Sequence, residues 1–194
     1  MSIANNLIGG LLVLFFLHAC TPAGMVASGS GSAMVIAEGE RSMGSVIDDA
    51  TIKVNIAAKF ISSEDNLFVD VSTTVLNGRV LLTGLVDNQE IRIDAVRKVW
   101  EVQGVQEVIN EIQIGSRAGL KEYVNDVWIN TQAKGVAAKA VGLRVVGYNF
   151  ETIRGKVYIA GITSRPEQLE DLIDAVKTIK GVKEIVNYVI IKKD

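Results

Sequence analysis

Residues 78–114 read GRVLLTGLVDNQEIRIDAVRKVWEVQGVQEVINEIQI, and residues 155–191 read GKVYIAGITSRPEQLEDLIDAVKTIKGVKEIVNYVII. The two stretches align without a gap at a constant offset of 77 residues. Glycine falls on glycine at three places along this alignment, namely at 78 and 155, 84 and 161, and 104 and 181. Such glycines commonly have a positive φ or permit a close backbone approach, so their unchanged spacing predicts the same turns in both copies.

A helical pattern precedes the first copy. Apolar residues recur every four positions at Ile52, Ile56 and Phe60, which predicts an amphipathic helix. The acidic residues Asp48 and Asp49 stand just ahead of this pattern. Carboxylates at a helix start cap the first turn or face solvent, so we expect this pair to mark the N-terminus of the helix and to have no catalytic role.

Two strands, a second helix and a third strand follow in the first copy. Residues 69–75 alternate between apolar and polar side chains, and Asn77-Gly78 is a typical hairpin turn that leads into a strand at 79–86. Residues 87–103 keep helical spacing, and 105–114 read as a strand. The predicted order is therefore helix, strand, strand, helix, strand.

The second copy repeats this order. Its first helix carries Ile129, its hairpin turn is Arg154-Gly155, its second helix covers 166–180 and its last strand covers 182–191. We expect an α+β fold of two tandem αββαβ domains, residues 47–115 and 116–194. Each domain should be a three-stranded sheet with two helices on one face.

The repeated pattern resembles the BON domain, and the resemblance covers residues 47–191. Three motifs carry it in the first copy: Asp49-x-x-Ile52, Gly78-x-Val-x-Leu-x-Gly84 and Gly104-Val-x-x-Val108. Their counterparts begin at Asp126, Gly155 and Gly181. The resemblance implies a periplasmic or outer-membrane protein of a Gram-negative cell that binds phospholipid surfaces and supports envelope integrity, without enzymatic activity.

The N-terminus predicts export and lipid attachment. Eleven uncharged residues, Leu7 to Leu17, form an apolar run too short to span a bilayer comfortably, which is typical of a signal peptide ending at residue 19. The sequence Leu17-His18-Ala19-Cys20 resembles the lipobox of bacterial lipoproteins, which implies a diacylglycerol on Cys20. By the same resemblance, a residue other than Asp after the cysteine implies the periplasmic face of the outer membrane. The alternative is an ordinary leader with a chance cysteine.

The segment between this cysteine and the first domain, residues 20–46, lacks any sustained period of two or 3.6 residues. We expect it to be a flexible tether with a root-mean-square span of roughly 25–30 Å.

Residue types that are absent exclude several chemistries. After removal of the leader, the chain contains no histidine and no cysteine besides the acylated Cys20. Cys/His nucleophilic pairs, Ser-His-Asp triads and the usual zinc ligand sets are therefore excluded. We expect no catalytic residues, no metal site, no cofactor and no small-molecule substrate.

Charge divides unequally between the two predicted domains. Residues 47–115 contain six Lys/Arg and eleven Asp/Glu, whereas residues 116–194 contain thirteen and nine. A basic domain on a lipid-anchored chain is expected to bind anionic phospholipid. The leading alternative is an interaction scaffold, in which the acidic domain pairs with the basic domain or recruits envelope proteins. Nucleic acid is not expected, because the chain is exported and has no aromatic-rich basic groove.

One helix of the second domain carries the candidate membrane contacts. At 100° per residue, the predicted core face contains Ile129, Ala133, Val136 and Ala140, and another side groups the candidate phospholipid-binding residues Lys121, Trp128, Gln132 and Lys139. A tryptophan among lysines is typical of an interfacial anchor. Two placements stay open: Trp128 points outward, or Gly135 breaks the helix and Trp128 packs in the core or between domains. Trp100, next to Val99, is expected to be a packing or interdomain residue.

Overall fold

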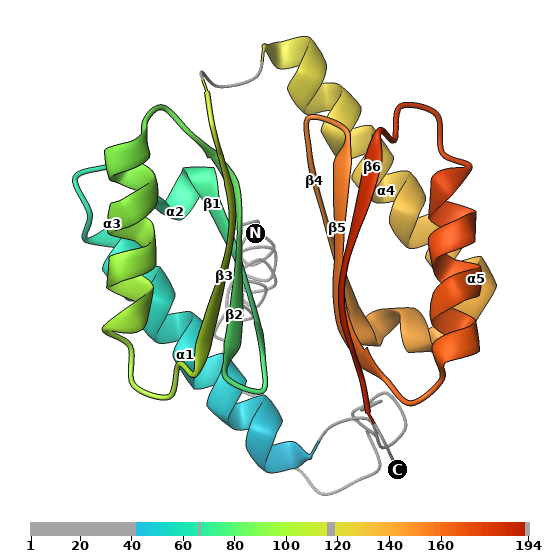
Figure 1. The fold of residues 1–194 in the computed structure, drawn as a ribbon, viewed down its shortest axis with the longest axis horizontal. Coiled ribbons are helices and arrows are strands. Elements are labelled where there is room, and N and C mark those ends of the chain that lie inside the picture. Colours follow the sequence, from blue (N-terminus) through green and yellow to red (C-terminus); the bar gives the residue numbers. More distant parts are fainter. Residues whose placement is uncertain (1–41, 66, 116–118, 193–194) are drawn as a thin grey trace, which may run out of the picture. The chain divides into compact units, whose positions relative to one another are not determined.

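The computed structural model describes residues 42–65, 67–115 and 119–192. The predicted signal peptide, Cys20 and the predicted tether up to residue 41 lie outside the described residues. The first domain contains α1 (Met43–Ile61), α2 (Leu67–Asp70), β1 (Val71–Leu76), β2 (Arg79–Val86), α3 (Gln89–Trp100) and β3 (Glu107–Ile114) (Figure 1). The second contains α4 (Leu120–Val141), the 3-10 helix η1 (Gly142–Gly147), β4 (Tyr148–Ile153), β5 (Lys156–Thr163), α5 (Pro166–Lys177) and β6 (Glu184–Ile191).

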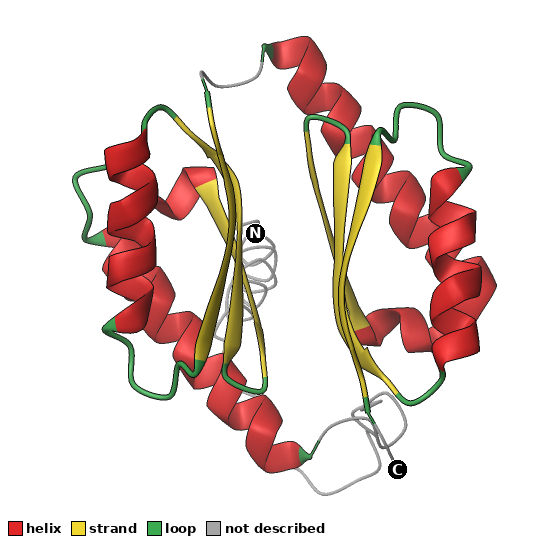
Figure 2. Cartoon of the chain, in the orientation of Figure 1, coloured by secondary structure: helices red, strands yellow, loops and turns green. Residues whose placement is uncertain are grey.

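Each domain is a three-stranded sheet, which confirms the predicted α+β class. The first two strands pair antiparallel around a tight turn, and the third strand pairs in parallel with the second. The strand orders are β1-β2-β3 and β4-β5-β6, so β2 and β5 are the central strands. The two main helices of each domain lie on one face of its sheet, as predicted (Figure 2).

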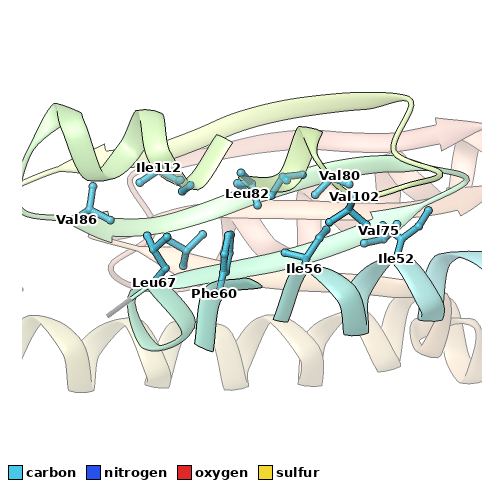
Figure 3. Packing of buried hydrophobic residues seen from close by; sticks show 13 residues of the cluster. Ile52, Ile56, Phe60, Leu67, Val75, Val80, Leu82, Val86, Val102 and Ile112 are labelled. Atoms are coloured by element: carbon cyan, nitrogen blue, oxygen red, sulfur yellow. The ribbon is translucent and has the colours of Figure 1, made fainter. Parts of the chain in front are cut away.

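The core of the first domain lies between α1, α3 and their sheet. Ile52, Ile56 and Phe60 project from α1 onto the sheet and are at most 4% exposed (Figure 3). They pack with apolar residues of the strands, of α2 and of α3, and the equivalent cluster in the second domain is centred on α4 and α5. Burial of these side chains is the main source of stability for each domain.

Helix α1 begins earlier than the position predicted from its acidic residues. Its N-cap is Ser42, whose hydroxyl accepts a hydrogen bond from the backbone N–H of Ser45 at 3.2 Å. Asp49 consequently lies inside the helix and is 5% exposed, whereas Asp48 is exposed. The prediction that both carboxylates mark the helix start is therefore wrong, because the hydroxyl of Ser42 satisfies the first turn.

The predicted strand at 69–75 also begins later than expected. Residues 67–70 form the short helix α2, which is anchored by the fully buried Leu67, and Val69 is largely exposed. The chain enters β1 at Val71, which pairs with Gly84 on β2. Alternation along the sequence indicated a strand but not the point at which hydrogen bonding to β2 begins.

Helix α4 is continuous through Gly135, so the alternative in which Gly135 breaks the helix does not hold. A Cβ atom added at Gly135 would meet nothing within 4 Å. The buried row is Ile129, Ala133 and Ala137, and the predicted core residue Ala140 is exposed. This row follows the i, i+4 ridge of the helix, along which side chains pack onto the sheet.

The described residues of both domains belong to one compact unit of the chain. The sheet faces that carry no helices share an apolar cluster of Leu76, Leu81, Ala160 and Ile162. At its margin the hydroxyl of Tyr188 donates to the Glu111 carboxylate. Burial and this carboxylate both raise the pKa of Tyr188, so the phenol stays protonated.

Candidate docking surface on helix α4

Helix α4 brings the four sequence-predicted residues to its solvent-exposed side. Trp128 is 45% exposed, and Lys121, Gln132 and Lys139 are exposed as well. Their spacings of seven, four and seven residues are close to whole helical turns, so the four side chains lie along one side of the helix. At 1.5 Å per residue this row is about 27 Å long. Of the two placements of Trp128, the structure therefore has the outward one.

Three apolar neighbours of Trp128 were not singled out from the sequence. Tyr123, Val124 and Val127 are between 48% and 62% exposed and precede Trp128 on the same helix. A second apolar pattern at positions 123, 124, 127 and 128, next to the core row, was the signal that could have identified them. We call Lys121, Val124, Val127, Trp128, Gln132 and Lys139 together the α4 outer face, and Tyr123 lies on the flank towards Asp126.

The opposite side of α4 is held against its own hairpin. The buried carboxylate of Asp126 accepts hydrogen bonds from the backbone N–H groups of Arg154, at 2.6 Å, and Gly155, at 2.8 Å. Charge-assisted bonds of this kind are stronger than neutral ones and fix the helix relative to the sheet. Asp126 therefore positions the α4 outer face, and its oxygens are already engaged by the turn.

Charge pairing between the domains uses the sheets rather than the α4 outer face. The Nζ of Lys156 lies 3.6 Å from a carboxylate oxygen of Glu111 in the first domain, and 3.3 Å from one of Glu184 in its own domain. Burial alone would lower the pKa of Lys156, but Tyr158 and these two carboxylates raise it, which keeps the amine charged. Lys121 and Lys139 stay exposed, so pairing of the acidic and basic domains does not cover the candidate surface.

A cleft of about 560 Å³ adjoins the α4 outer face. Its lining includes Tyr123 and Val127 of α4, Glu151 of β4 and Ser72 of β1. Burial raises the pKa of Glu151, and the hydrogen bond with Ser72 and the nearby Lys134 only partly oppose this effect. The exposed apolar surface of α4 thus continues into a partly enclosed space.

Two further observations concern membrane contact. Among the helices of the described ranges, none is both long and apolar enough to cross a bilayer. Trp100, at the end of α3, is 52% exposed, so the prediction that it is a packing or interdomain residue is wrong. Its neighbour Val99 is buried, and the next position on a helix points about 100° away, which here is into solvent.

Comparison with known proteins gives matches along most of the chain. Residues 48–116 and 125–193 each match the model of the BON domain. An uncharacterised protein from the gshII 5′ region of Anaplasma centrale is 36% identical over 147 residues, which cover 75% of this chain and 96% of that protein. Outer membrane lipoprotein DolP of Haemophilus influenzae is 28% identical over 178 residues, which cover 88% of each chain. The 21 kDa hemolysin of Actinobacillus pleuropneumoniae is 27% identical over 154 residues, which cover 77% of this chain and 78% of that protein.

Proposed function

This chain belongs to the BON domain family, and from that premise we propose that it is a non-enzymatic, lipid-anchored envelope protein whose second BON domain binds anionic phospholipid. The observation that carries the proposal concerns Trp128 on α4. Its side chain is exposed next to exposed apolar residues, and Lys121 and Lys139 lie before and after it on the same helix. Docking at the periplasmic face of the outer membrane would support envelope integrity.

The composition of the α4 outer face supports a membrane surface as the partner. Indole prefers the boundary between headgroups and acyl chains, and Val124 and Val127 add apolar area beside Trp128. Each Lys near an anionic leaflet contributes about 1 kcal/mol to the free energy of membrane binding, and salt screens this attraction. A lipid anchor and a weak amphipathic surface together give firmer attachment than either alone.

The proposed location is supported by the relatives. The match to the outer membrane lipoprotein covers 88% of this chain, whereas residues 48–194 make up only about three quarters of it. That match therefore extends into the sequence ahead of the first BON domain, where the lipobox-like Leu17-His18-Ala19-Cys20 is found. Acylation of Cys20 would leave the domains on a short tether at the membrane.

An interaction scaffold is the second candidate function. The ion pair between Lys156 and Glu111 supports the idea that the basic and acidic domains pair with each other. Because that contact leaves Trp128 exposed, domain pairing and lipid binding are compatible. The two functions differ in whether the isolated protein binds lipid without any envelope protein.

Vesicle co-sedimentation tests lipid binding directly. Residues 20–194 with Cys20→Ser, which lack the acyl chain, are mixed with phosphatidylglycerol vesicles and with phosphatidylcholine vesicles. We expect salt-sensitive binding to phosphatidylglycerol only. Trp128→Ala and the double variant Lys121→Glu/Lys139→Glu should each weaken binding by about tenfold or more, because they remove the apolar anchor and reverse the flanking charge.

Matched controls come from the same chain. Trp100→Ala removes the other exposed tryptophan, and Lys177→Glu/Lys180→Glu makes the same change of net charge on the α5 side of the second domain. Both controls should bind as the parent protein does. Absence of binding to either vesicle type would refute lipid docking and would favour the interaction scaffold as the function.

A further inference from the structure

Helix α1 is apolar on two opposite sides. Its inner side packs in the core through Ile52, Ile56 and Phe60. Its outer side exposes Ile47, Val54 and Ile61, which are 59%, 67% and 64% exposed. A helix that is apolar on two sides normally buries both sides. The exposed outer side of α1 therefore indicates a surface that another molecule covers.

The outer residues form a continuous line along the helix. Thr51 and Ala58, both exposed, lie between the three large residues, so the spacing alternates between four and three positions. This alternation is the spacing of a coiled-coil seam, in which two helices pack side chains into one another. We call Ile47, Thr51, Val54, Ala58 and Ile61 the α1 outer stripe.

A membrane is a poor match for this stripe. The stripe contains no tryptophan, tyrosine, lysine or arginine, in contrast to the α4 outer face. The domain that carries it has an excess of acidic residues, which an anionic leaflet would repel. The composition therefore favours another apolar helix as the partner.

The large residues of the stripe are symmetric about Val54. Ile47 and Ile61 lie seven residues before and after it, and the smaller stripe residues Thr51 and Ala58 lie between these large residues on either side. Two copies of α1 that cross antiparallel at Val54 would thus place isoleucine against isoleucine and valine against valine. Self-complementarity of this kind is the requirement for a two-fold symmetric interface.

Charge complementarity favours the same antiparallel arrangement. Asp48 and Lys59 are eleven residues apart, close to three helical turns, so they lie on the same flank of α1. In the antiparallel pair, Asp48 of one copy would lie beside Lys59 of the other, whereas a parallel two-fold pair would place the corresponding flanks of the two copies on opposite sides of the seam, out of each other's reach. An ion pair with Glu101 at 2.8 Å already holds Lys59 on this flank.

We propose that the α1 outer stripe is a dimerisation seam, through which two copies of this chain pair their α1 helices antiparallel about a two-fold axis at Val54. The seam is separate from the α4 outer face and does not depend on lipid binding. Lipid anchoring of both copies to one leaflet would raise their local concentration and favour pairing.

Sedimentation equilibrium of residues 20–194 with Cys20→Ser tests the seam without lipid. We expect a reversible monomer–dimer equilibrium. Val54→Glu and Val54→Lys should each weaken the dimer by about tenfold or more, because both place like charges on the axis. An equimolar mixture of the two variants should regain the dimer, since Val54 faces its own counterpart. Lys53→Glu, an exposed change beside the stripe, is the control.

Cysteine crosslinking under mild oxidation tests the orientation. Val54→Cys should link to itself, and Ile47→Cys should link to Ile61→Cys in a mixture but not to itself. A protein that stays monomeric up to ~1 mM, or variants at Val54 that dimerise as the parent does, would overturn the seam. Faster linking of Ile47→Cys to itself than to Ile61→Cys would overturn the antiparallel arrangement. Circular dichroism verifies that every variant is folded.

Discussion

Asp49 and Asp126, 77 residues apart, have the same structural role in the two domains. Each buried carboxylate accepts the two backbone N–H groups of its own hairpin turn, at 2.8 and 2.9 Å for Asp49 and at 2.6 and 2.8 Å for Asp126. The first turn residues, Asn77 and Arg154, have positive φ values of 52° and 53°, which are uncommon for residues other than glycine. The carboxylate thus joins a helix to a turn of unfavourable backbone conformation.

Loss of this carboxylate should destabilise a domain without affecting lipid contacts. We expect Asp126→Asn to lower the free energy of unfolding by about 2–4 kcal/mol, because a neutral amide cannot accept from both N–H groups equally well. Urea unfolding measures the change. Asp171→Asn, which alters an exposed carboxylate of the same domain, should have little effect, and equal losses for the two variants would contradict the assigned role.

Glycine substitutions at two positions should have opposite effects on stability. A Cβ atom at Gly84 would lie 2.1 Å from the carbonyl oxygen of Asp70, so Gly84→Ala must displace the chain where it enters β1. We expect Gly84→Ala to lower the free energy of unfolding by about 1–3 kcal/mol. Gly135→Ala on α4 has open space around the added methyl and should stabilise by about 0.5–1 kcal/mol. Thermal unfolding of both variants measures these changes. If both variants were stabilised, or both destabilised, the prediction of opposite effects would be wrong.

The raised pKa of Glu151 predicts a specific dependence of stability on pH. In the folded chain this carboxyl keeps its proton to a higher pH than its ordinary value of 4.5, chiefly because it is buried. Stability should therefore fall as pH rises from about 4.5 through the raised pKa, and stay reduced above it. Glu151→Gln removes this loss and can still accept a hydrogen bond from Ser72.

Unfolding experiments at several pH values check this expectation. Glu151→Gln should be more stable than the parent protein at pH ~8, and the difference should vanish below pH ~4.5. Glu170→Gln changes an exposed carboxylate and serves as the control. Parallel pH profiles for the parent and Glu151→Gln would show that Glu151 is not the responsible group.

The two tryptophans allow the membrane-facing side to be identified by fluorescence. Trp100→Phe leaves only Trp128, whose emission should shift to shorter wavelength on phosphatidylglycerol vesicles as the indole leaves water. The opposite variant, Trp128→Phe, reports only Trp100 and should show no shift. Raising the salt to ~0.5 M should reduce the shift, because lysine attraction to the leaflet is screened. A shift confined to Trp100 would assign lipid contact to the first domain instead.

Much of the fold followed from patterns along the chain. The 77-residue offset, the glycines at 78, 84 and 104, and their matches predicted two copies of one αββαβ unit, and both copies are present. The strand at residues 79–86 was predicted with its observed ends. Local periodicity and turn chemistry are short-range properties, so a single sequence records them directly.

The candidate site was only partly predictable. Helical spacing placed Lys121, Trp128 and Lys139 on one side of a helix, but it left open whether Gly135 would interrupt that helix. It also missed Tyr123 and Val127, because they lie on the flank between the predicted core face and the row of lysines, and neither pattern includes that flank. Whether an apolar side chain is buried depends on what packs against it.

The sequence alone determined the number of domains, the order of their elements and the charge difference between them. Only the tertiary structure decided that Asp49 holds a turn, that Trp100 and Trp128 are both exposed, and that the domains meet through Leu81 and Ala160. The physical reason is distance along the chain. Turns and helix periods arise among near neighbours, whereas burial, hydrogen-bond partners and sheet contacts depend on residues brought together by folding.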